Sequence, residues 1–90
     1  MESVEKLTQR FEKLVSLPAG NRKIALFESL KYQVEDLVST FFDKQCFNRL
    51  SNEPDEKEFM ILELALQNLD SLYLKISSFL DNEPFERIIF

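Results

Sequence analysis

Helix-breaking residues are few in this chain, and long segments between them contain no glycine or proline. The 90 residues include one glycine and three prolines. Pro18 and Gly20 lie together in the motif LPAGN, whereas Pro54 and Pro84 lie in the motifs LSNEPDE and LDNEPFE. Because glycine and proline are the residues that a helix interior tolerates least, their positions predict turns near residues 18–20 and 54. The segments between these turns can each form a long helix.

The apolar residues of these segments recur at alternating spacings of three and four, which places them on one face of an α-helix. The first two segments carry them at Val4, Leu7, Phe11, Leu14, Phe27, Leu30, Val34, Leu37 and Phe41. The third segment carries them at Phe59, Leu62, Leu66, Leu69, Tyr73, Ile76 and Leu80. We therefore predict helices over residues 3–17, 22–44 and 54–81, with residues 44–52 forming either a last turn or a loop.

Polar residues suited to helix N-caps lie at the start of each segment. Ser3 and Asn21 are the predicted caps of the first two helices, and Ser51 or Asn52 is the predicted cap of the third. The same pattern returns in LDNEPFE, which predicts that a short helix begins near Asn82.

The expected fold is therefore all-α. It is a single helical domain over residues 1–90, an up-down-up three-helix bundle with a short fourth C-terminal helix. The sequence ends in Ile88, Ile89 and Phe90, and natural domains seldom end in exposed apolar residues. This tail either folds back onto the bundle or marks the chain as the N-terminal portion of a longer protein.

The residue types that most catalysis depends on are missing. The sequence contains no histidine and one cysteine, which excludes Ser-His-Asp and Cys-His arrangements and cysteine-rich metal sites. The carboxylates around Pro54 lack the central glycine of a calcium loop and are explained as first-turn acids of a helix. Cys46 is expected to be a buried or inert thiol. We expect no enzyme activity, no catalytic or metal-binding residues and no cofactor.

Charge is unevenly distributed along the chain. Residues 1–50 carry eight bases and seven acids, a balance of +1, whereas residues 51–90 carry three bases and nine acids, a balance of −6. Nucleic acid and anionic membrane surfaces are bound by basic stripes, so neither is an expected partner. No apolar run is long enough to insert into a membrane. These features favour a cytoplasmic or nuclear protein.

The third segment is apolar on more than one stripe, and a short first helix and a second helix cannot cover all of it. We therefore expect either a homodimer or a helical partner chain. The predicted partner-binding residues lie off the clean helical seams or in the C-terminal tail: Phe42, Met60, Leu64, Leu74, Phe85, Ile88 and Phe90. The predicted function is a non-catalytic protein–protein interaction module, namely an adaptor, a scaffold or an oligomerisation domain.

Two other functions stay open. A small acidic inhibitor or immunity-type protein would use the acidic second half against a basic partner. The stretch MILELALQNLDSL, residues 60–72, resembles the second helix of the BAG domain, a three-helix bundle that binds the ATPase domain of a heat-shock chaperone. That resemblance implies a small helical co-chaperone. The chain departs from the BAG pattern because its apolar spacing continues to Leu80 and no basic helix follows.

Overall fold

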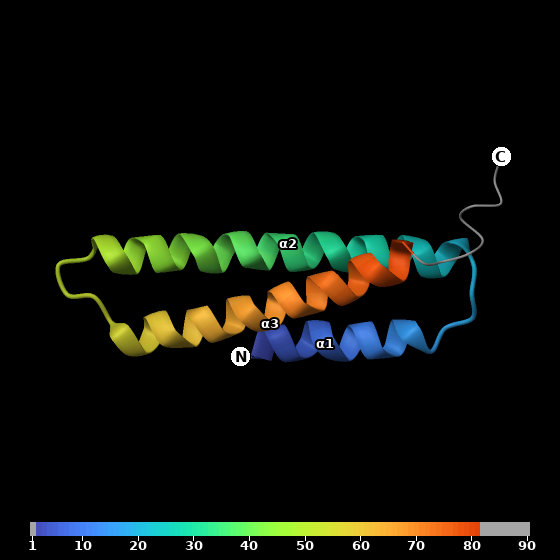
Figure 1. Ribbon diagram of the computed structural model, residues 1–90, viewed down its shortest axis with the longest axis horizontal. Coiled ribbons are helices and arrows are strands. Elements are labelled where there is room, and N and C mark those ends of the chain that lie inside the picture. Colours follow the sequence, from blue (N-terminus) through green and yellow to red (C-terminus); the bar gives the residue numbers. More distant parts are fainter. Residues whose placement is uncertain (1, 82–90) are drawn as a thin grey trace.

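Three α-helices make up the described part of the protein. The computed structural model describes residues 2–81 as α1 (Glu2–Val15), α2 (Asn21–Leu50) and α3 (Glu56–Asp81), with no β-strand among these residues. Consecutive helices run in opposite directions and lie side by side (Figure 1). The molecule measures 56 × 24 × 15 Å, because α2 and α3 are long helices that pack along their length. The all-α prediction is confirmed, and the predicted fourth helix falls outside the described residues.

The second helix is longer than its apolar spacing predicts. Residues 44–50 continue α2 as regular helix, so they are not a loop. The helix ends at Ser51, whose extended backbone (φ −69°, ψ 150°) cannot continue it. Thus the absence of glycine and proline, and not the end of the apolar stripe, determined how far α2 extends.

The predicted N-caps of the first two helices are wrong. Ser3 lies inside α1, which begins at Glu2. Asn21 is the first residue of α2, and the preceding Gly20 supplies no side-chain cap. The backbone carbonyl of Gly20 instead accepts a hydrogen bond from the Ile24 amide at 3.3 Å, which closes the first turn of the helix.

Asp55, and not Ser51 or Asn52, caps α3. Its Oδ1 accepts hydrogen bonds from the backbone amides of Lys57 and Glu58 at 3.0 and 3.2 Å. These amides are among the donors that the start of a helix leaves without an intrahelical partner. The capping residue follows Pro54 and does not precede it, so the third helix begins two residues later than the sequence predicts.

The core lies along the α2–α3 contact and under α1. Its fully buried side chains are Phe27, Leu30, Val34, Leu62, Leu69 and Ile76. One aromatic cluster joins all three helices: the Phe27 ring stacks on Phe79 at 4.2 Å between centroids and meets the edge of Phe11 at 5.7 Å. Aromatic pairs at such separations add to the stabilisation that burial alone gives.

Candidate interaction surface

Helix α1 covers only part of the hairpin formed by α2 and α3. Its N-terminal turn lines one hollow together with Thr40 of α2 and another together with Asn68 of α3. Because α1 begins there, α2 and α3 run on without it to the loop that joins them (Figure 1). We call residues 41–50 of α2 and 56–67 of α3 the uncovered half.

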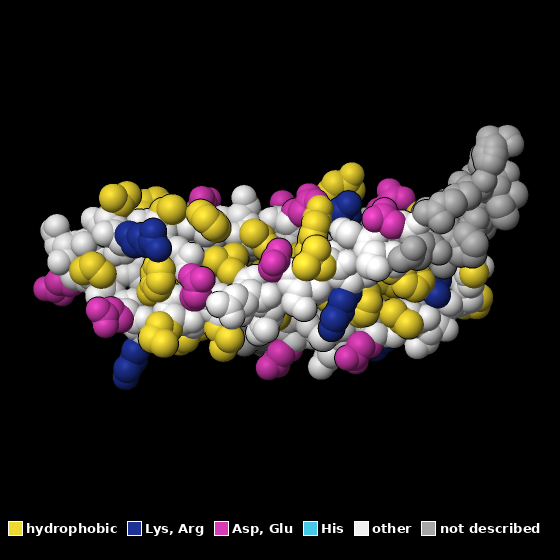
Figure 2. All heavy atoms as spheres, in the orientation of Figure 1, with side chains coloured by type: hydrophobic (Ala, Val, Ile, Leu, Met, Phe, Trp, Pro, Cys, Tyr) yellow, Lys and Arg dark blue, Asp and Glu magenta, His cyan; other side chains and the backbone are white. Residues whose placement is uncertain are grey.

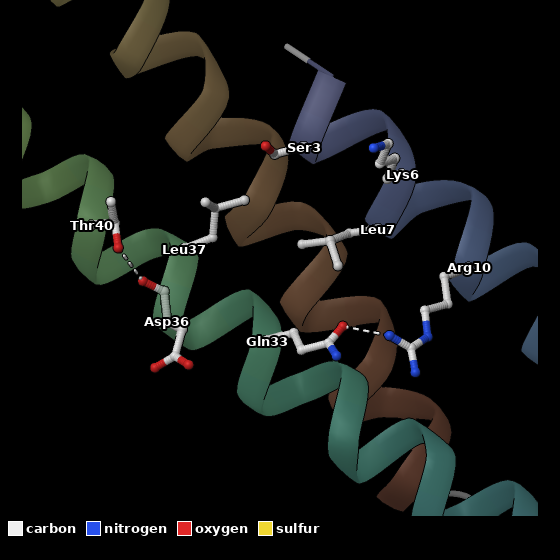
Figure 3. A pocket seen from close by; sticks show the side chains of 8 residues that line it. All are labelled: Ser3, Lys6, Leu7, Arg10, Gln33, Asp36, Leu37 and Thr40. Carbon is white, nitrogen blue, oxygen red and sulfur yellow. Dashed lines mark hydrogen bonds between the residues drawn. The ribbon is translucent and has the colours of Figure 1, made fainter.

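A close view of the α1–α2 contact shows how this register is held. Figure 3 draws the side chains that line the hollow: Ser3, Lys6, Leu7, Arg10, Gln33, Asp36, Leu37 and Thr40. The guanidinium of Arg10 donates a 2.7 Å hydrogen bond to Oε1 of Gln33. Apolar burial of Val4 and Leu14 fixes the two ends of α1 against the hairpin.

Large apolar side chains are exposed throughout the uncovered half: Phe42, Phe47, Leu50, Met60, Ile61 and Leu64. Phe47 is 77% exposed and Met60 is 71% exposed, values typical of charged surface residues and not of aromatic or thioether side chains. Figure 2 shows hydrophobic side chains over this end of the molecule, next to the loop that joins the two long helices. Exposed apolar side chains grouped in this way are typical of interaction surfaces.

Part of this patch continues the face on which α1 packs. Residues seven apart lie on the same side of a helix, two turns from each other. Ile61 lies seven residues before Asn68, and Phe47 lies seven residues after Thr40, so both lie on the α1 side of the hairpin. Leu64, four residues before Asn68, lies next to Ile61 on the same side. A helix placed end to end with α1 would cover these three residues.

The predicted partner-binding residues fall into three groups. Phe42, Met60 and Leu64 are exposed in the uncovered half, whereas Leu74 is exposed on the half that α1 covers. The predicted contacts Phe85, Ile88 and Phe90 lie outside the described residues.

The predicted partner-binding residues do not include Phe47, Leu50 or Ile61, although Phe47 and Ile61 also lie off the clean helical seams. A comparison of helix lengths is the signal that could have found them, because α1 has 14 residues whereas α2 has 30. Because α1 is about half as long as α2, it leaves one end of the α2–α3 hairpin uncovered.

One polar side chain is buried between the two helices of the uncovered half. Nε2 of Gln45 donates to Oε2 of Glu63 at 3.0 Å and to the backbone carbonyl of Phe59 at 3.5 Å. A buried amide that finds its partners at only one register favours that register over shifted ones.

Cys46, the next residue, is exposed, so the expectation of a buried thiol is wrong. Helix α2 continues through residue 46 and turns this side chain outward.

Exposed apolar side chains in the uncovered half are the feature of the described residues that bears most on function. Across residues 2–81, no three side chains of the Cys, Asp and Glu types are grouped so that they could hold a metal ion. Within the same residues, no helix combines the length and the apolar character that crossing a bilayer requires. The chain matches no protein family, no curated protein and no solved structure with which it was compared, so its surface is the basis for any functional conclusion.

Proposed function

We propose that this protein is a non-catalytic helical interaction module that binds another helical chain through its uncovered half. The observation that carries the proposal is the grouping of Phe47, Ile61 and Leu64 on the side where α1 stops. Burying apolar surface stabilises a complex by about 25 cal/mol per Å². An additional helix on this side would complete a helical bundle over the full length of α2 and α3.

The partner is either a second copy of this chain or a helix of a different protein. Both would use the same side of the hairpin, since a bundle-completing helix packs into the groove between two others. Adaptor, scaffold and oligomerisation functions all follow from such a contact.

A matched pair of leucines on α3 provides the test. Leu64→Glu places a charge in the uncovered half, and Leu74→Glu places the same charge on the covered half at the same exposure, 60% against 61%. Sedimentation velocity over a range of concentrations measures self-association, and capture from the source cell with identification by mass measures binding to other chains. Leu74 is a contact predicted from the sequence, but it lies on the covered half, outside the interface proposed here. We therefore expect Leu64→Glu to abolish association and Leu74→Glu to leave it unchanged, with equal helicity by circular dichroism.

Two outcomes would contradict the proposal. One is a wild-type chain that stays monomeric at all concentrations and captures the same proteins as the Leu64→Glu variant. The other is unfolding by Leu64→Glu alone, which would make Leu64 part of the monomer's core.

A further inference from the structure

A second surface lies on the side of the α2–α3 hairpin opposite α1. It is a hollow of about 420 Å³ lined by Glu35, Val38, Ser39, Phe42, Asp43, Asp70 and Tyr73. None of these residues lines the hollows that α1 forms with α2 and α3. The hollow is therefore separate from the groove that a bundle-completing helix would occupy.

The hollow combines an apolar floor with a negatively charged rim. Val38 and Tyr73 are half-buried, and Phe42 is 59% exposed. The carboxylates of Asp43 and Asp70 lie at its exposed edge, as does that of Glu35. No hydrogen bond or ion pair from residues 2–81 satisfies these three carboxylates.

Two cations of α2 lie over aromatic rings of α3, and one of these rings belongs to Tyr73, which lines the hollow. Nζ of Lys31 is 5.4 Å from the centre of the Tyr73 ring, and the Arg49 guanidinium carbon is 4.9 Å from that of Phe59. In each pair α2 supplies the cation and α3 supplies the ring.

Phe42 lies between these two pairs without a cation of its own. Arg49 follows Phe42 by seven residues, and Lys31 precedes Val38 by seven. Because Val38 and Phe42 are four residues apart, these four residues lie on one side of α2. No Lys or Arg of the described residues lies over the Phe42 ring. An apolar ring among carboxylates is a favourable environment for a cationic side chain with an aliphatic stem.

We propose that this hollow binds an arginine or lysine side chain from a basic segment of a partner protein. The aliphatic stem would lie on Val38, since Lys31 already lies over the ring of Tyr73, and the charged group would lie over Phe42 among the carboxylates of the rim. A net charge of −5 would attract such a segment at long range. The inference goes beyond the proposed function, because it concerns a different face and a different chemistry.

A divalent metal ion is a poorer occupant than a basic side chain. Such an ion needs several oxygen ligands that converge on one point. The carboxylates of the rim are spread around an apolar floor and form no group that could hold a metal.

The test compares two triple variants of the full chain that change the net charge equally. Glu35→Gln with Asp43→Asn and Asp70→Asn neutralises the rim, whereas Glu5→Gln with Glu12→Gln and Glu53→Gln neutralises exposed carboxylates elsewhere. The probe is a fluorescein-labelled hexa-arginine peptide, with binding followed by fluorescence anisotropy. We expect the rim variant to weaken binding by about tenfold and the control by less than about twofold, because only close charge pairs contribute strongly.

A substitution at the ring tests the aromatic part of the hollow. Phe42→Leu retains an apolar side chain but removes the ring, and should weaken peptide binding by about threefold. Leu64→Glu should leave peptide binding unchanged. Association then reports on the uncovered half and peptide binding reports on the hollow, so failure of one proposal can be told from failure of the other.

Equal weakening by the two triple variants would show that the peptide responds to net charge and would overturn the proposal. Absence of measurable wild-type binding at low salt would also overturn it. Unchanged binding in Phe42→Leu would remove the ring from the site and contradict the proposal in its stated form.

Discussion

At the scale of single residues, Lys23 connects the end of α1 to the start of α2. It is 8% exposed, which is rare for a lysine. Its ammonium group donates to the backbone carbonyls of Val15 and Leu17 at 3.1 and 2.9 Å and lies 4.7 Å from the centre of the Phe79 ring. These carbonyls belong to the C-terminal end of α1 and the turn after it, where cations are favoured.

Replacing this lysine by methionine keeps the stem and removes the charge. Lys23→Met should lower the free energy of unfolding by about 2 kcal/mol, because the part-buried carbonyls of Val15 and Leu17 lose a charged donor. Urea denaturation followed by circular dichroism measures the change. Lys57→Met, at an exposed position, serves as the control and should change stability by less than about 0.5 kcal/mol.

Two phenylalanines of the same helix differ completely in environment. Phe27 is fully buried in the aromatic cluster, whereas Phe47 is 77% exposed in the uncovered half. Phe27→Ala should cost about 3–5 kcal/mol through the cavity that it leaves. Phe47→Ala should change the stability of the monomer by less than about 0.5 kcal/mol. Equal losses in thermal denaturation would mean that Phe47 is also part of the monomer's core.

At the scale of secondary-structure elements, the loop between α2 and α3 is held by two side chains. Nδ2 of Asn48 donates to the backbone carbonyl of Asp55 at 2.7 Å, and Oδ1 of Asn48 accepts from the Asp55 amide at 2.8 Å. Asp55 in turn caps α3. The end of one helix is thus bonded to the start of the next, which fixes the hairpin at its loop.

Loss of the Asp55 cap should lower the stability of α3 while leaving its packing against α2 unchanged. Asp55→Ala removes the acceptor for two first-turn amides and should cost about 1 kcal/mol. Glu53→Ala, two residues earlier in the same loop and also exposed, is the matched control. A melting temperature that falls equally in both variants would show that the loop charge, and not the cap, stabilises the hairpin.

At the scale of the whole molecule, the two halves of the hairpin differ in how many helices pack together. One half is packed by three helices, and the other consists of α2 and α3 alone. Fewer buried contacts lower the free energy of local opening. The uncovered half is therefore expected to open more readily than the half that α1 covers.

Hydrogen exchange should reveal this difference directly. In the monomer, amides of residues 42–50 and 58–66 should exchange about tenfold or more faster than amides of residues 26–36, because local opening there costs less. Mass spectrometry of peptides from the two regions measures the rates. Uniform protection along α2 would contradict the division into two halves.

Most of the fold could be predicted from the sequence, because helix formation depends on local features. The 3-4 spacing of residues such as Phe27 and Leu69 placed them correctly in the core, and Pro18 with Gly20 located the first turn. Caps were less predictable, since several polar residues near a helix start compete for the role. At α3 that competition was decided for Asp55 by the loop that Asn48 holds.

The candidate surfaces were only partly accessible to sequence reasoning. Met60, Leu64 and Phe42 stand out because they lie off the helical seams. The hollow does not stand out, because Phe42 and Tyr73 are far apart in the chain and meet only when α2 packs on α3.

The sequence by itself determined that this protein consists of helices, where its first turn lies and which faces are apolar. Those properties follow from backbone preferences and from the period of a helix. Only the tertiary structure decided how far α1 reaches along the hairpin. That register depends on long-range packing, with Val4 buried at one end of α1 and Lys23 bonded to the carbonyls at the other. It is this register that leaves Phe47, Ile61 and Leu64 uncovered.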